Sequence, residues 1–369
     1  MSDRPTTPAG RVKRTLAELA VAVGVTAATL LALEGGASAL LLQHDLRAAT
    51  RPPARARPLT VPDTLLGWRN AAGLARPDEY GRGVALGTTA DGLRRTPDAT
   101  ASTVRARVAC TGDSYTFGVG VADDRHWCAL LPALLPGVQT ADMAQPSYGL
   151  DQLLLWYRRD GARVPHDVQL LAVTHAELER AVSDDDAGWP KPRLALDGGR
   201  LVTRGVPVPP AAGAMRSYRL GEAVGDLRLV QALHRIPSLD PDARTAARID
   251  DAHPLFEAML DELAATHRGR HTRLVLAYLP TMRDARPGPR DARRAWLAAA
   301  AARRAIPFLD LTPALRTLRP DSLDLAFIAR TSPLVVPRAV GQYSTVGHAW
   351  VARQLAARLD SLLPGLPNR

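Results

Sequence analysis

The sequence predicts an α/β fold in which a parallel sheet is covered by helices on both faces, preceded by one membrane-spanning helix. Two observations predict it. From about residue 62 onward, five short apolar runs suited to buried strands alternate with helical segments, an order typical of a parallel sheet between two helical layers. Before them lies one long apolar stretch. A composition of 46% hydrophobic and 23% charged residues is that of a chain able to build a packed core.

The apolar stretch is Thr15–Leu33, which contains a single acidic residue, Glu18. As a helix it would be about 28 Å long, close to the hydrocarbon thickness of a bilayer. Basic residues at positions 11, 13 and 14 precede it, which favours a cytoplasmic amino end and a main domain on the other side. We therefore expect a single-pass protein of the cytoplasmic membrane whose main domain is extracytoplasmic.

These features divide the chain into four parts. We expect a cytoplasmic basic tail over 1–14, an anchor with an interfacial segment over 15–42, an Arg/Pro/Ala-rich linker over 43–61 and the main domain over 62–369. Proline makes a helix in the linker unfavourable. Two alternatives remain for the apolar stretch: a cleaved signal peptide, with Ala37-Ser38-Ala39 as its small-residue cleavage site, or a buried helix of a soluble fold.

The expected strands and helices of the main domain follow one another in order. The strands are 107–111, 138–143, 168–173, 273–279 and 307–311. The helices are 124–135, 151–161, 254–267, 291–305 and 345–363. The region around 183–252 interrupts the alternation and is predicted to be an insertion.

Local signals support several of these elements. Asp151 follows a glycine and can cap the helix that starts there, and Ser344 or Thr345 can cap the last helix. Asp197-Gly198-Gly199 predicts the turn of a β-hairpin inside the insertion, followed by a proline-rich exit.

The formal net charge of +10 invites a nucleic-acid function, which the residues do not support. Nearly all the basic residues are arginines scattered among alanines and prolines, and few aromatics are present to stack on bases. We expect no nucleic-acid partner, and at most a weak attraction to anionic lipid.

The chain has two cysteines, Cys110 and Cys128, and no Cys-x-x-Cys pair. This spacing excludes a zinc site made of cysteines. The two thiols can pair in an oxidising compartment, or they can be two small buried side chains. No cluster of His, Cys or carboxylates has metal-ligand spacing, so we expect no metal and no cofactor.

A serine follows the first expected strand, in the stretch VACTGDSYTFGVGV. Gly-Asp-Ser places the hydroxyl of Ser114 at the carboxyl end of a parallel strand, where open α/β sheets bind ligands. Gly112 permits a tight turn before it. The tripeptide predicts a nucleophile only if a base is present to take its proton.

The longer pattern GDSYTFGVGVADDRHWCALLPALL resembles the first block of the SGNH, or GDSL-like, serine hydrolases of the membrane-anchored bacterial type. ADMAQPSYGLDQLLL resembles their second block, and YSTVGHAWVARQLAARL resembles their closing segment, so the resemblance extends from about residue 62 to 363. It implies a three-layer αβα sandwich with a mainly parallel, five-stranded, flavodoxin-like sheet. It also implies hydrolysis of a small-molecule or glycan ester or acyl substrate, with Ser114 as the catalytic residue.

The resemblance also implies an oxyanion hole, and here the sequence departs from the family pattern. The family takes backbone N–H groups from the serine and from a glycine of the second block, and an asparagine side chain from a third block. The glycine position reads Ser147, which is tolerable if the turn does not need a positive φ. The asparagine position reads His175 or Ala176, and His175 can donate instead.

The largest departure is in the closing Asp-x-x-His or Asp-Gly-His motif, whose histidine removes the serine proton. In VPRAVGQYSTVGHAWVA the aspartate position reads Val340 or Ala339, and the histidine position reads Gln342. An amide cannot accept a proton near neutral pH.

Other histidines are candidate substitutes for the base. His348 is the first of them, and His126, His166 and His175 follow. Two hypotheses therefore stand. One is an esterase, acyl hydrolase or acyltransferase that uses Ser114 with an unusual base; the other is a catalytically inactive binding or assembly module of the cell envelope, with a possible protein partner.

Overall fold

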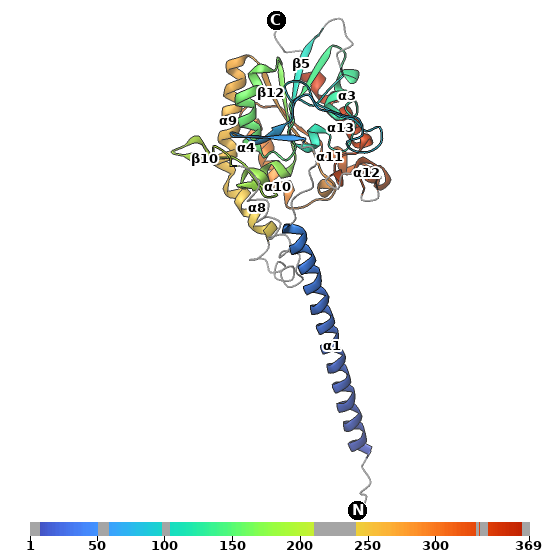
Figure 1. Cartoon of the computed structure of the whole chain (residues 1–369). Helices are drawn as coiled ribbons and strands as arrows, with labels where there is room; N and C mark the ends of the chain where they lie inside the picture. The colour runs from blue at the N-terminus through green and yellow to red at the C-terminus, as the bar shows by residue number, and fades with distance from the viewer. Residues whose placement is uncertain are drawn as a thin grey trace, which may run out of the picture. The chain divides into compact units, whose positions relative to one another are not determined.

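The structure is a computed structural model of the chain (Figure 1) and describes residues 8–50, 59–97, 104–209, 241–329, 332 and 339–363. The chain separates into two compact units. The described part of the first unit is helix α1, and the second unit is the α/β domain. Each is described by itself.

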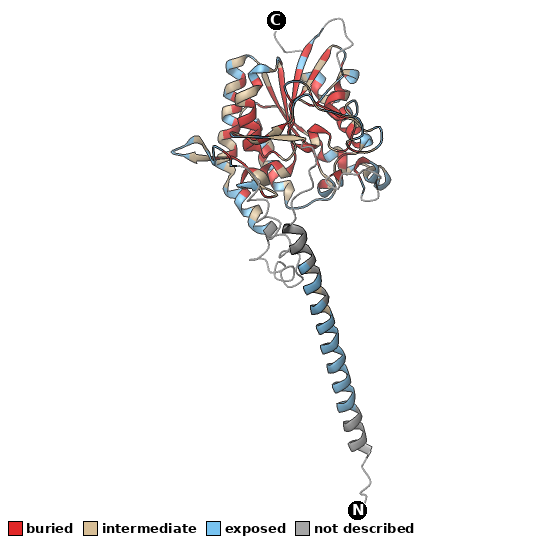
Figure 2. Ribbon diagram, viewed as in Figure 1, coloured by how far each residue is buried: buried red, intermediate tan, exposed pale blue. Residues whose placement is uncertain are grey.

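Helix α1 spans Pro8–Thr50. Its segment Leu16–Leu40 is long and apolar enough to cross a membrane, and none of it is buried against other parts of the protein. Figure 2 shows its exposed surface as a continuous pale-blue ribbon. The helix is longer than the predicted anchor, since it includes residues 8–14 of the basic tail and 43–50 of the linker. Linker residues 51–58 lie outside the described residues.

The α/β domain is built on a five-stranded, fully parallel sheet with the order β13-β12-β7-β5-β6. Its strands are β5 (Ala106–Thr111), β6 (Val138–Asp142), β7 (Val168–Val173), β12 (Arg273–Tyr278) and β13 (Phe308–Asp310). Numbered along the chain, this is the 2-1-3-4-5 order of the flavodoxin-like sheets. The predicted fold class is therefore confirmed, and each predicted strand is present to within one residue at either end.

Helices cover both faces of the sheet (Figures 1 and 2). Alternate residues of the central strand β7 point to opposite faces, as the two-residue period of a strand requires. Leu170 and Ala172 pack in the apolar cluster of α3 (Trp127–Leu134) and α13 (Thr345–Leu359). Leu171 and Val173 pack in the cluster of α4, α9 and α10. The result is the expected αβα sandwich.

The remaining helices extend from the sheet in chain order. They are α2 (Ser114–Phe117), α4 (Leu150–Asp160), α5 (His175–Ala181), α8 (Pro241–Asp251), α9 (His253–Arg270), α10 (Arg290–Ala302), α11 (Thr312–Arg316) and α12 (Pro320–Ala326). Short 3₁₀ turns are η1 (Gly161–Arg163), η2 (Met282–Ala285) and η4 (Asp360–Leu362). The predicted helix 345–363 therefore ends as an α-helix at Leu359 and continues for one 3₁₀ turn.

The insertion contains the predicted hairpin, with β10 (Arg193–Asp197) antiparallel to β11 (Arg200–Arg204). Gly198 and Gly199 both have positive φ (56° and 80°) at its turn, which glycine allows without strain. Residues 210–240 of the insertion lie outside the described residues, and β8 (Asp185–Asp186) pairs with β9 (Trp189–Pro190) before the hairpin.

The prediction that Asp151 caps α4 is wrong. Gly149 is the N-cap, and Asp151 lies inside the first turn with its carboxylate 2.7 Å from the Nζ of Lys191. Both side chains are fully buried. Lys191 comes from the insertion, so this ion pair fixes the insertion to α4. By contrast, Ser344 caps α13 as predicted, since its hydroxyl accepts a hydrogen bond from the N–H of Gly347.

The chain before β5 forms two small two-stranded sheets. β1 (Thr60–Asp63) pairs with β2 (Gly67–Asn70), and β3 (Ala75–Arg76) pairs with β4 (Leu86–Gly87). A buried arginine, Arg94, follows them; its guanidinium donates to the carbonyl of Val121 and lies over the ring of Phe117. It therefore holds this segment against the loop that follows α2.

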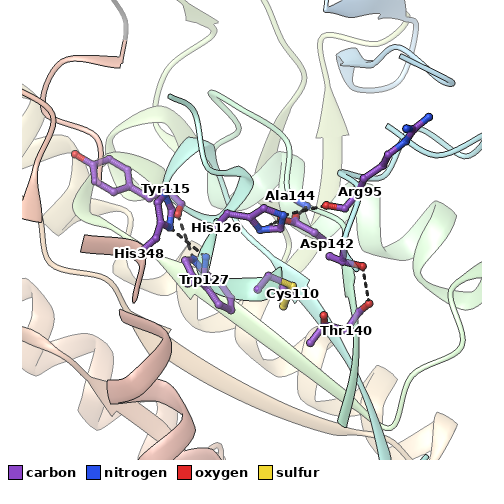
Figure 3. The surroundings of a disulfide bond; sticks show 11 residues. Arg95, Cys110, Tyr115, His126, Trp127, Thr140, Asp142, Ala144 and His348 are labelled. Atoms are coloured by element: carbon purple, nitrogen blue, oxygen red, sulfur yellow. Dashed lines mark hydrogen bonds and ion pairs between the residues drawn. A yellow bond between two sulfur atoms is a disulfide. The ribbon is translucent and has the colours of Figure 1, made fainter. Parts of the chain in front are cut away.

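Cys110 and Cys128 form a disulfide that joins β5 to α3 (Figure 3). Both cysteines are fully buried within the α3 and α13 cluster. Of the two alternatives for these residues, the pairing is the one that the structure shows.

Candidate functional site

Ser114 lies where the resemblance places it, at the carboxyl end of the first strand of the sheet. β5 ends at Thr111, and Ser114 is the first residue of the short helix α2. Its side chain is close to buried, at 8% exposed. Gly112 is required at the turn, because a Cβ there would lie 2.2 Å from the hydroxyl oxygen of Thr116 and 2.5 Å from the carbonyl oxygen of Ala172.

Asp113 is held in place by three partners. One carboxylate oxygen accepts from the N–H of Tyr115 at 2.9 Å and so caps α2. The other is 2.8 Å from the guanidinium of Arg180 and accepts the hydroxyl hydrogen of Ser114 at 3.4 Å. A buried carboxylate that already pairs with arginine is a poor proton acceptor. We therefore regard Asp113 as a residue that positions the serine rather than as its base.

Gln342 is next to Ser114, although 228 residues separate the two in the sequence. Its amide nitrogen Nε2 donates to the hydroxyl oxygen of Ser114 at 3.1 Å. The amide oxygen is buried and has no hydrogen-bond partner among the described residues. If the amide is rotated by 180°, the oxygen faces Ser114 instead; in either orientation the amide can hold the hydroxyl but cannot take its proton.

The loop that carries Gln342 is fixed at several points. The hydroxyl of Tyr115 donates to the carbonyl of Gly341 at 2.9 Å, and the N–H of Ile328 donates to the carbonyl of Gln342 at 2.8 Å. Gly341 has φ 83°. Of the two candidate aspartate positions, Val340 is 42% exposed and Ala339 is fully buried. Neither can orient or charge a neighbouring group.

The structure places His348 in the core, behind α3. The ring is buried, and its Nδ1 accepts from the backbone N–H of Trp127 at 3.2 Å (Figure 3). Burial, and then the positive charges of His126 and Arg94, lower its pKa well below the ordinary value. Its edge contacts the ring of Tyr343. These contacts are those of a neutral packing residue.

Other partners also occupy the remaining candidate bases. His126 Nδ1 lies 3.1 Å from a buried Asp142 oxygen, and its Nε2 lies 3.0 Å from the carbonyl of Arg95 (Figure 3). His166 Nε2 is 2.7 Å from the hydroxyl of Tyr157. Within the part of the chain that the structure describes, the hydrogen bonds of the Ser114 hydroxyl are those to Asp113 and Gln342.

His175 is the first residue of α5, and its Nε2 is 3.5 Å from the carboxylate of Glu179 one turn further along. Burial, followed by the charges of Arg290 and Arg293, lowers its pKa to about 4. The ring is therefore neutral at pH 7, with one N–H to donate. Its neighbour Ala176 has no donor on its side chain.

Ser147 adopts φ 68°, in the left-handed region. The condition under which serine was tolerable at the glycine position, a turn without positive φ, is therefore not met. Left-handed backbone costs a residue with a Cβ about 1–2 kcal/mol. The strain lies in the loop between β6 and α4, at the same edge of the sheet as Ser114.

Sequence reasoning missed two charged residues beside the serine, Arg180 and Glu177. Glu177 is buried, and its carboxylate accepts from the backbone N–H and the hydroxyl of Thr174. Burial, and then the nearby Asp113, raise its pKa well above the ordinary value. The Thr174-x-x-Glu177 spacing is a capping box that the sequence already contained; the ion pair of Arg180 with Asp113 had no local signal.

No family model matches the chain, and no curated protein matches it. Several solved structures are similar. One is a member of the lipolytic protein G-D-S-L family from Veillonella parvula, with 14% identity over 68% of this chain and 97% of that chain and a TM-score of 0.37. Another is Axe2, an acetylxylan esterase from Geobacillus stearothermophilus, with 13% identity over 69% of this chain and 94% of that chain and a TM-score of 0.39. LAE5, an alpha/beta hydrolase enzyme from the metagenome of Lake Arreo, has 14% identity over 72% of this chain and 98% of that chain and a TM-score of 0.39.

At such low identities and TM-scores, the fold assignment depends on the sheet itself. A parallel sheet in the order β6-β5-β7-β12-β13, with a serine capped by aspartate at the end of its first strand, defines an SGNH-like fold of the esterase type. Within that fold, this chain places an amide against the serine hydroxyl.

Proposed function

We propose that this chain is a membrane-anchored, extracytoplasmic SGNH-like module that binds an ester- or acyl-bearing ligand of the cell envelope at Ser114 without hydrolysing it. Of the two hypotheses that the sequence left open, this is the one that the geometry favours. The observation that carries it is the amide nitrogen of Gln342, 3.1 Å from the serine oxygen.

The chemical argument concerns the serine proton. Removing the base from a serine triad lowers kcat by on the order of 10⁴–10⁶. A glutamine amide cannot replace the base, and Asp113 is paired with Arg180. The hydroxyl can still donate to and accept from a ligand, since it keeps one hydrogen and its lone pairs. The site therefore retains the groups for binding and lacks the one for proton transfer.

Two features support the location. Leu16–Leu40 can span a bilayer, and basic residues lie on its amino-terminal side, which favours that end in the cytoplasm. Cys110 and Cys128 are joined in a disulfide, and disulfides persist mainly in oxidising compartments outside the cytoplasm. Both features place the α/β domain on the extracytoplasmic side in this proposal.

An active-site fluorophosphonate probe tests the proposal. The full-length chain in detergent is incubated with the probe, alongside Ser114→Ala and a purified serine esterase as a positive control. We expect labelling of the esterase alone. Labelling of the wild type that disappears in Ser114→Ala, together with hydrolysis of short p-nitrophenyl esters, would instead establish the serine hydrolase.

A further inference from the structure

Two cavities of about 450 and 290 Å³ lie on the β6 side of the sheet. They have Asp91, Leu93, Arg163 and Val164 in common, so they form one groove with two lobes. Ser114 lines neither lobe. The larger lobe has the volume of an ordinary ligand site.

The groove exists because one face of the edge strand β6 is left open. Val138 and Asp142 of this strand are buried, whereas Gln139 and Ala141, which point to the other face, are half-buried and line the smaller lobe. None of the five residues of β6 belongs to the apolar cluster that packs under α4 on that face. The groove thus lies where the helical layer stops short of the sheet edge.

Charged side chains line the larger lobe in alternating order. The carboxylate of Asp63 lies 3.8 Å from Arg69 and 2.7 Å from Arg159. The carboxylate of Asp160 lies 2.9 Å from Arg159 and 3.1 Å from Arg163. Each acid therefore bridges two guanidiniums, and the lobe carries three arginines and three aspartates, counting Asp91.

This chain of ion pairs is fixed and stays ionised. Burial alone would raise the pKa of Asp63, but the hydrogen bond from Arg159 outweighs it and leaves that pKa below the ordinary value. Arg69 and Arg163 are at the ends of the chain, with side chains 39% and 77% exposed. Their guanidiniums have N–H groups left to donate to a ligand.

Other polar groups of the groove are also available. The indole N–H of Trp156, which lines the larger lobe, is buried with no acceptor among the described residues. The amide of Gln139 supplies a donor and an acceptor to the smaller lobe, and the exposed Asp91 supplies an acceptor to both.

We propose that this groove binds a neutral, extended oligosaccharide, such as a segment of a cell-envelope glycan. Hydroxyl groups both donate and accept, so they can pair with arginine N–H groups and aspartate oxygens that are already arranged in alternation. A strongly anionic ligand would have to compete with aspartates for arginines that are already paired. The two lobes favour a chain of sugars over a single ring. The site is separate from Ser114 and does not depend on whether that residue hydrolyses anything.

Calorimetry on the full-length chain in detergent tests this proposal with cellohexaose, xylohexaose and chitohexaose as neutral probes and hexagalacturonate as the anionic one. We expect at least one neutral hexamer to bind at a single site. Arg163→Ala and Gln139→Ala should each weaken that binding by about 5- to 10-fold, the effect of losing one hydrogen bond. Arg303→Ala removes an exposed arginine that pairs with Glu257 and, as the matched control, should leave binding unchanged.

Three outcomes would overturn the groove. The first is that no neutral hexamer binds, and the second is that hexagalacturonate binds more tightly than all of them. The third is that Ser114→Ala abolishes binding while Arg163→Ala and Gln139→Ala do not, which would assign the glycan to the serine site and leave the proposed function standing. Thermal melts of every variant confirm that a loss of binding is not a loss of folding.

Discussion

The segment that carries the serine and the segment that closes the domain have kept different things. In residues 108–121 the structural and the chemical positions of the SGNH pattern are both present: Gly112 makes the turn, Asp113 caps the helix and Ser114 presents its hydroxyl. In residues 339–348 the structural positions remain, while the positions of the acid and the base read Val340 and Gln342.

Each retained residue of the closing segment has a packing or capping role. Ser344 caps α13. Gly347 lies where a Cβ would be 2.0 Å from the carbonyl oxygen of Ala326. His348 accepts a hydrogen bond from the Trp127 backbone. The comparison teaches that the fold requires these residues whether or not a proton is transferred, so the base can be replaced without disturbing the helix behind it.

The largest expected effect is a gain of chemistry in the closing segment. Val340→Asp with Gln342→His restores the Asp-Gly-His spelling around Gly341 and places an imidazole where the amide now contacts Ser114. We expect p-nitrophenyl acetate hydrolysis to rise by about 10²–10⁴-fold, the usual contribution of a general base. The triple variant that adds Ser114→Ala is the control and should return to the wild-type rate. No gain would show that the rest of the pocket has also changed.

The second expected effect is on stability and concerns a retained structural position. Gly347→Ala forces a methyl group against the backbone of Ala326. Overpacking of this severity should lower the free energy of unfolding by at least about 3 kcal/mol. Gly288, where a Cβ would meet nothing within 4 Å, provides the control Gly288→Ala. Urea unfolding measures both; equal stability of the two variants would contradict the structural role of Gly347.

The third effect separates buried histidines from bases. The pKa of His175 is about 4 in the folded chain, below its ordinary 6.5, so the unfolded chain binds more protons between these values and stability falls as the pH falls from about 6.5 to 4. His175 alone should account for about 3 kcal/mol of that loss. Its contribution is fully present above pH 6.5.

The measurement is urea unfolding at several pH values for the wild type and for His175→Gln. The variant should lose less stability on acidification, because it removes a ring that the folded state keeps neutral. An identical pH dependence in the two proteins would mean that His175 titrates freely in the folded state.

The smallest effect concerns the second block. Ser147 adopts φ 68°, so Ser147→Gly should relieve a left-handed cost of about 1–2 kcal/mol and lose about 0.5–1 kcal/mol to backbone entropy. A net stabilisation of up to about 1 kcal/mol is expected in thermal or urea unfolding. Destabilisation by this change would indicate that the hydroxyl, rather than the backbone, is what the loop requires.

The sequence alone predicted features that depend on local patterns. The strand β7 was predicted to the residue, since six consecutive apolar or shielded positions are typical of a strand buried on both faces. The hairpin turn at Gly198 and Gly199 followed from the need for positive φ, and the Leu16–Leu40 span from length and hydropathy. Where a local signal misled, at Asp151, a distant lysine had outcompeted the role of helix cap.

The sequence by itself thus determined the strands, most helices, the apolar span and the absence of a base at the expected position. Only the tertiary structure decided what lies against the serine: the Gln342 amide, 228 residues away along the chain, and the Asp113 carboxylate, neutralised by Arg180. The groove beside β6 is likewise made by β1, β2, α4 and the edge strand together. Strand and helix propensities act over neighbouring residues, whereas contacts between distant segments exist only after the sheet has brought them together.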